Sequence, residues 1–137
     1  MTPTPAPSPP WMTVLLMLLG IAGCVALWVL VSVYTGRASS WMAVVAALDA
    51  ALLLRLARVR PGPWRAAWGV LVTAATILAA SWVVLAGLLG RMLGLAPWEA
   101  ATRLGARHAW VLAETTLGPA DFAWLAAGIV AAALLSR

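Results

Sequence analysis

The amino-acid sequence predicts an all-α, polytopic membrane protein: a helical bundle of four transmembrane helices, with one amphipathic interfacial helix between the third and the fourth. Hydrophobic residues make up 64% of the 137-residue chain and charged residues only 9%, whereas a soluble domain carries about a quarter charged residues. The hydrophobic residues gather in runs long enough to cross a bilayer, separated by short stretches with proline, glycine and arginine. This composition excludes a cytosolic enzyme, a nucleic-acid-binding module and a disordered tail.

The chain divides into an arm and a membrane domain. Residues 1–11 are rich in proline and uncharged, so we expect a disordered cytoplasmic arm, because proline lacks the amide hydrogen that a helix needs. Residues 12–137 form a single transmembrane helical domain. Its first span covers about residues 12–34, which reach about 34 Å as a helix and so cross a bilayer. Trp11 and Tyr34 mark the two interfaces of this span.

The next two spans are separated by a basic connection. The second, about residues 41–57, contains one acid near its middle, Asp49. The third, about residues 64–90, carries only hydroxyl groups as polar side chains between arginines at its ends. Prolines in residues 61–63 break the helix between them. The arginines around this break are expected to anchor it among lipid headgroups and to set the topology: Arg55, Arg58, Arg60 and Arg65.

Residues 97–117 differ from the spans because they carry charges at helical spacing. At about 100° per residue, several side chains fall in one sector: Glu99, Arg103, Arg107, Trp110 and Glu114. The opposite side carries Leu104, His108, Val111 and Leu112. Inserting a lone span with two central arginines costs several kcal/mol, so we expect this amphipathic helix to lie in the interface or to line the bundle. Residues 119–135 are the fourth span; if 97–117 also crosses, the chain has five.

Both ends of the chain are predicted to be cytoplasmic. The connection between the second and third spans carries four arginines, and the positive-inside rule places such a loop in the cytoplasm. With four spans, the N-terminal arm and Arg137 lie on that same side. Lysine, asparagine and glutamine are absent, while alanine, leucine and arginine are abundant. This usage is typical of a GC-rich bacterial genome, so we expect a multi-pass protein of the bacterial inner membrane.

Asp49 is the first candidate functional residue, for proton or ion coupling. A carboxylate in the middle of a bilayer is costly, so it faces the bundle interior and is paired, protonated or functional. Its neighbours one turn away are alanine, valine and leucine. A partner therefore has to come from another helix, with Thr73, Thr76 or an arginine as candidates, or the carboxyl group stays neutral with a raised pKa. A purely structural role in helix packing is the alternative.

The charged part of residues 97–117 supplies the second set of candidates, for contact with an anion or a partner protein: Glu99, Arg103, Arg107, His108 and Glu114. Two arginines one turn apart suit a phosphate or a carboxylate, which guanidinium groups bind through paired hydrogen bonds. The alternative is a solvated face whose charges pair along the helix, as Glu99 and Arg103 would at i,i+4. His108 is expected on the apolar side as a neutral, hydrogen-bonded imidazole.

No catalytic residue, metal site or cofactor is predicted. One cysteine and one histidine cannot complete a structural metal site, nor hold a haem between two histidines. The chain contains neither a phosphate-binding glycine loop nor a nucleophile triad, so we do not expect an enzyme. Residues 21–24, Ile-Ala-Gly-Cys, match a lipobox, yet no basic residue precedes them. We therefore expect Cys24 to pack as a small hydrophobic residue in the first span.

Small residues line the side of the second span that carries Asp49. Such faces let helices approach closely in lipid, so we expect this one to pack inside the protomer, or against a second copy or another membrane protein. The bilayer, including its anionic lipids, is the other expected partner, and nucleic acid is not. The leading hypothesis is a non-catalytic accessory or assembly subunit. The alternatives are a small proton-coupled transporter or channel that uses Asp49, and an immunity or holin-like membrane protein.

Overall fold

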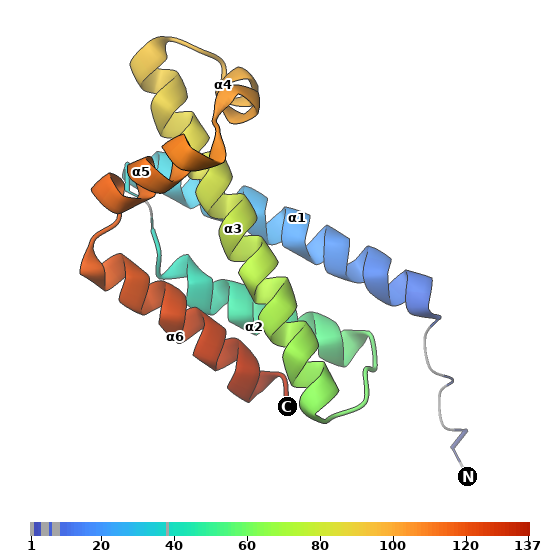
Figure 1. Ribbon diagram of the computed structural model, residues 1–137. Coiled ribbons are helices and arrows are strands. Elements are labelled where there is room, and N and C mark those ends of the chain that lie inside the picture. Colours follow the sequence, from blue (N-terminus) through green and yellow to red (C-terminus); the bar gives the residue numbers. More distant parts are fainter. Residues whose placement is uncertain (1, 4–5, 7–8, 38) are drawn as a thin grey trace.

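The computed structural model describes residues 2–3, 6, 9–37 and 39–137. Within these ranges, 82% of the residues are helical and none belongs to a β-strand, which confirms the all-α class. Figure 1 shows the helices in chain order: α1 (Pro10–Thr35), α2 (Met42–Leu56), α3 (Pro63–Leu93), α4 (Pro97–Arg103), α5 (Ala106–Thr116) and α6 (Pro119–Leu135).

The first helix begins two residues before the predicted start of the first span. α1 starts at Pro10, so Trp11 belongs to its first turn and not to the proline-rich arm. Proline is well tolerated there, since the first amide groups of a helix have no acceptor within it. Parts of the predicted arm and one residue of the turn after α1 lie outside the described residues: 1, 4–5, 7–8 and Ala38.

Proline and glycine set the ends of most helices. Proline also occupies the first position of α3, α4 and α6. α1 and α3 end where Gly36 and Gly94 adopt a left-handed backbone with a φ of 67°, a conformation that residues with a Cβ rarely take. These breaks divide a chain of almost continuous apolar character into separate helices.

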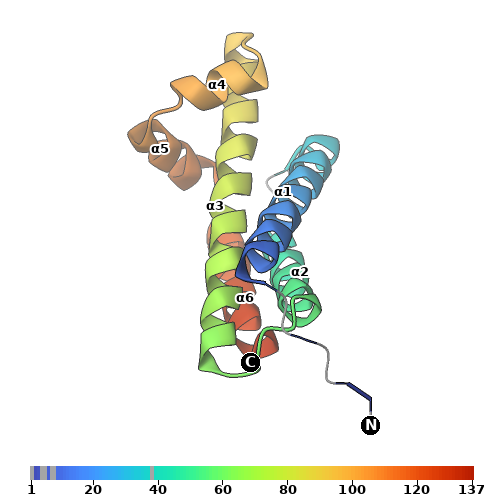
Figure 2. The same ribbon diagram turned by 90° about the vertical axis from the view of Figure 1, so that its right-hand side faces the viewer.

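Four helices, α1, α2, α3 and α6, form a bundle (Figures 1 and 2). α3 contacts each of the other three, and α6 packs most extensively on α2. α1 and α3 run in one direction along the bundle, whereas α2 and α6 run in the other. The C-terminal part of α3 extends past the bundle and carries α4 and α5.

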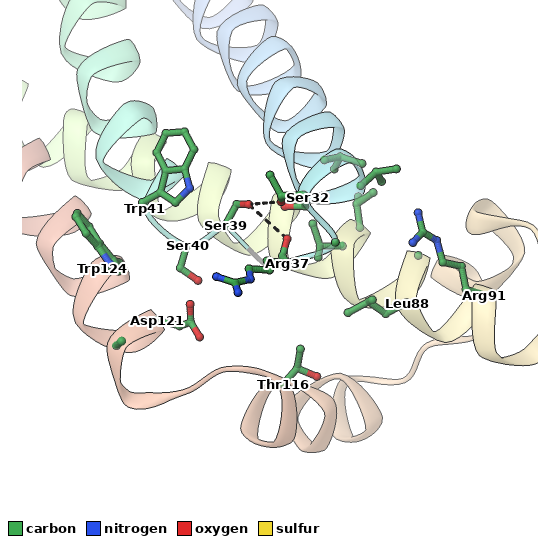
Figure 3. Close-up of a pocket in the computed structure, with 18 of the residues that line it drawn as sticks. Ser32, Arg37, Ser39, Ser40, Trp41, Leu88, Arg91, Thr116, Asp121 and Trp124 are labelled. Atoms are coloured by element: carbon green, nitrogen blue, oxygen red, sulfur yellow. Dashed lines mark hydrogen bonds between the residues drawn. The ribbon is translucent and has the colours of Figure 1, made fainter.

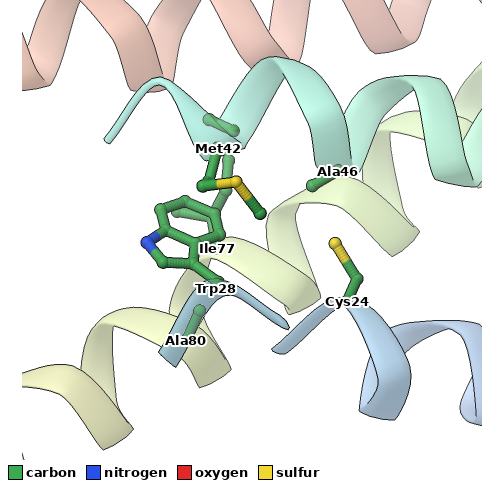
Figure 4. Close-up of a cluster of buried hydrophobic side chains, with 7 residues drawn as sticks. Cys24, Trp28, Met42, Ala46, Ile77 and Ala80 are labelled. Carbon is green, nitrogen blue, oxygen red and sulfur yellow. The ribbon is translucent and has the colours of Figure 1, made fainter. Parts of the chain in front are cut away.

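The bundle interior consists of clusters stacked along its length. The central cluster joins α1, α2 and α3 around the indole of Trp28, which is 2% exposed (Figure 4). A second cluster joins the first half of α1 to the end of α2 and the start of α3. A third holds α4 and α5 against the last part of α3. The buried members of the central cluster are Cys24, Trp28, Met42, Ala43, Ala46, Ile77 and Ala80.

The small-residue face of α2 packs inside the protein, which is one of the arrangements that the sequence predicts. Its buried alanines recur at helical spacing: Ala43, Ala46, Ala47, Ala50 and Ala51. Gly128 of α6 lies against the first of them, and a Cβ added at Gly128 would come within 2.7 Å of the Cβ of Ala43. α2 and α6 therefore approach almost to backbone contact, as small residues allow in lipid.

The prediction of one continuous helix over residues 97–117 is wrong. The segment forms two helices, α4 and α5, separated at Leu104 and Gly105. Leu104 is 4% exposed and packs in the cluster that joins α3 to α4 and α5. Glycine is a poor helix former, so Gly105 lowers the cost of the break. Burial of one leucine against α3 thus interrupts the predicted charged face.

Two helices qualify as membrane spans on their own. Among the described residues, α1 and α3, with 26 and 31 residues, are apolar and long enough to cross a bilayer. α5 and α6 meet the same criterion only as a pair, and the pair is bent by 111°. The chain therefore has two or three segments that suit a membrane by length and composition, which is consistent with a membrane protein.

Candidate functional site

Asp49 lies half-buried on α2. The expected hydroxyl partners do not reach it. Thr76 donates its hydroxyl hydrogen to the carbonyl oxygen of Val72 at 2.9 Å, and the buried hydroxyl of Thr73 has no partner among the described residues. Neither threonine is hydrogen-bonded to Asp49, so of the alternatives that the sequence leaves open, an arginine partner or a neutral carboxyl group remain.

Cys24 takes the position that the sequence predicts. Its side chain is 6% exposed and belongs to the central apolar cluster. The thiol is free. Cys24 thus packs as a small hydrophobic residue, as expected for a helix interior.

The second set of candidates is divided between two helices. Glu99 and Arg103 belong to α4, whereas Arg107, His108 and Glu114 belong to α5. All five side chains are exposed. Nothing in the described part of the chain joins Glu99 and Arg103 in the expected ion pair. The carboxylate of Glu114 instead accepts a hydrogen bond from the indole Nε1 of Trp110 at 2.7 Å.

The predicted environment of His108 is also wrong. We expected a hydrogen-bonded imidazole on an apolar face, but His108 is exposed. The face of α5 that packs on α3 carries Ala109, Leu112 and Ala113 instead. The break at Leu104 and Gly105 separates the segment into two helices with different axes. Side-chain positions calculated at about 100° per residue around one uninterrupted helix therefore no longer apply.

The four predicted headgroup arginines lie at one end of the bundle, but one of them has a structural role. Arg55, Arg58 and Arg60 are exposed around the turn that joins α2 to α3. Arg65, in the first turn of α3, is only partly exposed. Its Nε donates a hydrogen bond to the carbonyl oxygen of Ser136 at 2.7 Å, and its Nη2 donates to the carbonyl oxygen of Arg137. Arg65 therefore ties the start of α3 to the end of α6.

A cleft at the opposite end of the bundle is a feature that sequence reasoning missed. It has a volume of about 1250 Å³ and lies between the end of α1, the turn after it, the second half of α3 and the start of α6 (Figure 3). Arginines enter it from two elements, Arg37 from the turn and Arg91 from α3, and Asp121 enters from α6. We call this feature the α1–α3–α6 cleft.

Hydrogen bonds already occupy several polar groups around the α1–α3–α6 cleft. The Thr35 hydroxyl donates to the carbonyl oxygen of Val31 at 2.8 Å and lies 3.0 Å from the hydroxyl of Ser39. One carboxylate oxygen of Asp121 accepts a hydrogen bond at 2.8 Å from the backbone amide of Gly118, which caps α6. Figure 3 shows the guanidinium of Arg37 directed toward Ser40 and Asp121, inside the cleft.

The two arginines of the cleft remain available to a ligand. Neither Arg37 nor Arg91 forms a hydrogen bond through its guanidinium, or an ion pair, with any part of the chain that the structure describes. With Asp121 as the one acid in the lining, the charged residues leave a net charge of +1. Both arginines are visible in the sequence as charges beside apolar runs. No spacing rule places them together, because a turn and a distant helix supply them.

The arrangement offers charge and apolar surface but no clustered metal ligands. Over residues 2–3, 6, 9–37 and 39–137, no three His, Cys, Asp or Glu side chains gather closely enough to hold a metal ion. No protein-family model, curated protein or solved structure matches the chain.

Proposed function

We propose that this chain is a small bacterial inner-membrane protein that crosses the bilayer four times and serves as a non-catalytic accessory subunit. α1, α2, α3 and α6 are the four spans. α4 and α5 lie at the outer interface, where their exposed face contacts a partner membrane protein. The observation that carries the proposal is the placement of α4 and α5, which are fixed to α3 beyond the bundle and present charged and aromatic side chains outward.

The directions of the helices support four crossings. α1 and α3 run the same way, so the chain has to return across the membrane between them, and α2 makes that connection. α6 crosses back in the same manner as α2. Its end lies beside the start of α3, because Arg65 at the start of α3 binds the end of α6. α2 and α6 have 15 and 17 residues, about 22 and 26 Å as helices. They are short for a hydrocarbon core of about 30 Å, and packing against longer helices compensates for this.

The arginines support the orientation. The end of the bundle at the α2–α3 turn carries Arg55, Arg58, Arg60, Arg65 and Arg137. Arginine-rich short loops stay in the cytoplasm during insertion. The opposite end, with the α1–α3–α6 cleft and with α4 and α5, then faces outward. Both termini are cytoplasmic in this arrangement.

The surface of α4 and α5 supports a contact role. Trp98 is 72% exposed and Trp110 is 64% exposed, and tryptophan is favoured both at membrane interfaces and at protein contacts. One hydrogen bond and two buried apolar residues hold this surface to α3. The indole Nε1 of Trp82 donates to the carbonyl oxygen of Ala101 at 3.2 Å, and Ala100 and Leu104 are buried below.

Reporter fusions test the four crossings. A reporter active only in the cytoplasm is expected to be active after Arg60 and inactive after Arg37 and Gly94. A reporter active only outside should give the opposite pattern, because α2 and α3 each carry the chain across. If Arg37 and Arg60 report the same side, α2 does not cross and the four-span arrangement is wrong.

One observation favours a second function, a proton-coupled transporter. The half-buried carboxylate of Asp49 has no hydrogen-bond partner among the described residues, which is unusual for an acid inside a membrane bundle. However, Asp49 does not line the α1–α3–α6 cleft. If the chain is an accessory subunit, it does not transport protons. Ionisation of the Asp49 carboxyl group should then have no effect on proton flux.

Proton flux into vesicles separates the two functions. Proteoliposomes with the wild-type chain, Asp49→Asn or the exposed control Glu114→Gln are loaded with a pH-sensitive dye and given a pH step. The accessory proposal expects the same slow flux from all three, close to that of protein-free vesicles. Faster flux from wild type and Glu114→Gln that is lost in Asp49→Asn would establish the transporter instead.

A further inference from the structure

We propose that the α1–α3–α6 cleft binds one anionic phospholipid of the outer leaflet, with its headgroup attracted by the net positive charge of the lining and an acyl chain along the apolar wall. This inference rests on the membrane placement proposed above and is independent of the accessory role. It assigns a ligand to a cavity lined by two arginines whose guanidinium groups bind no other group in the described part of the chain.

The lining of the cleft has a polar part and an apolar part, as a phospholipid has a polar headgroup and apolar acyl chains. Its polar part comes from the turn after α1 and the start of α6, with Arg37, Ser40 and Asp121 (Figure 3). Its apolar part comes from facing sides of α1 and α3, including Val33 and Val84. A volume of about 1250 Å³ exceeds the roughly 300–1,000 Å³ of pockets for small soluble ligands. A molecule with a charged end and a long apolar end fills such a space.

The charges select an anion as the polar end. Arg37 and Arg91 have no acidic partner within hydrogen-bond distance among the described residues, and Asp121 already accepts the amide of Gly118. A guanidinium presents paired donors that match the oxygens of a phosphate. A zwitterionic lipid brings a cation along with its phosphate, so the lining's net charge of +1 favours a headgroup with net negative charge.

The position of the cleft identifies the source of that anion as the bilayer. The end of α1 lies at the interface once its apolar run spans the hydrocarbon core. Trp41 and Trp124 both line the cleft, and tryptophan is enriched at headgroup level. A soluble phosphate would leave the valine wall without an apolar partner, whereas a lipid covers both parts.

Substitution of the arginines tests the polar half of the site. The full-length chain is placed in nanodiscs of phosphatidylcholine with a minor fraction of phosphatidylglycerol, and retained lipids are counted by native mass spectrometry. Wild type should retain one phosphatidylglycerol. The double variant Arg37→Gln/Arg91→Gln should bind it about tenfold more weakly, because the lining loses both of its exposed positive charges. The matched control Arg55→Gln/Arg60→Gln, at the opposite end of the bundle, should retain it.

Filling the cleft tests the apolar half. Gly87 lines the cleft, and a Cβ built there meets no atom within 4 Å, so Gly87→Leu should fold normally and occupy the space of an acyl chain. Its matched control is Gly23→Leu, since Gly23 on α1 is equally open but lies outside the cleft. Gly87→Leu should lose the retained phosphatidylglycerol, and Gly23→Leu should keep it.

Several results would overturn the lipid site. Retention of phosphatidylglycerol and phosphatidylcholine in proportion to the nanodisc composition is one, and equal loss in both arginine pairs is another. Displacement of the lipid by inorganic phosphate, with Gly87→Leu unaffected, would show a site for a soluble anion. In each case a chain that still resists carbonate extraction leaves the proposed placement in the membrane intact. Extraction of wild type by carbonate would contradict both proposals.

Discussion

Replacing Trp28 by alanine is expected to destabilise the folded bundle by about 3 kcal/mol. The indole of Trp28 is 2% exposed at the centre of the cluster that joins α1, α2 and α3 (Figure 4). In lipid, apolar side chains gain little from leaving their solvent, so helix association depends on close packing. Removal of this ring takes away many dispersion contacts at once and leaves a cavity that Met42 and Ile77 cannot fill.

The measurement is reversible unfolding in mixed micelles, followed by far-UV circular dichroism as a denaturing detergent is added. Trp64→Ala is the matched control, because Trp64 is 71% exposed and its recorded ring contact is an edge-on one with Trp68 at 6.2 Å. The control should lose less than about 1 kcal/mol. Equal losses for Trp28→Ala and Trp64→Ala would show that the central cluster does not hold the helices together.

The second large effect is expected at the contact between α2 and α6. A Cβ added at Gly128 would lie 2.7 Å from the Cβ of Ala43 and 2.8 Å from both its carbonyl carbon and its carbonyl oxygen. The clash involves the backbone of α2, which has no rotamer to change, so α6 has to move away. We expect Gly128→Leu to cost about 3 kcal/mol or more and to separate the two helices.

Matched variants make this prediction specific. Gly23→Leu adds the same side chain to α1, where a new Cβ meets nothing within 4 Å, and it should unfold at the wild-type detergent concentration. Gly128→Ala, which adds only the clashing Cβ, should fall between wild type and Gly128→Leu. A distance between spin labels on α2 and α6 that stays unchanged in Gly128→Leu would contradict the close approach.

The sequence predicts the helical class and most helix ends for simple physical reasons. Long runs without charges are compatible with few structures other than helices in a membrane. Proline and glycine then mark where α3, α4 and α6 begin and where α1 and α3 end. The break at Leu104 and Gly105 was not predicted, because its cause is the burial of Leu104 against α3, a contact between distant parts of the chain.

Less of the candidate site than of the fold could be predicted from the sequence. Asp49 and Cys24 were correctly placed within helices, yet the expected threonine partners of Asp49 are not near enough to bond it. The α1–α3–α6 cleft combines Arg37 and Arg91, which are separated by most of two helices. Such a cavity depends on helix crossing angles, and an amphipathic projection of one helix at a time contains no information about them.

Cys24 has a practical consequence, since it is the one cysteine in the sequence and its thiol is covered where α1 meets its neighbours. An alkylating reagent can reach the sulfur only while α1 is lifted away from the other helices. Under slow labelling, the ratio of its modification rate to that of an unstructured peptide equals the fraction of time spent in that opened state. The alkylation rate of Cys24, followed as an increase in mass, therefore reports how often the helices separate locally in the native chain. No substitution has to be introduced for this measurement.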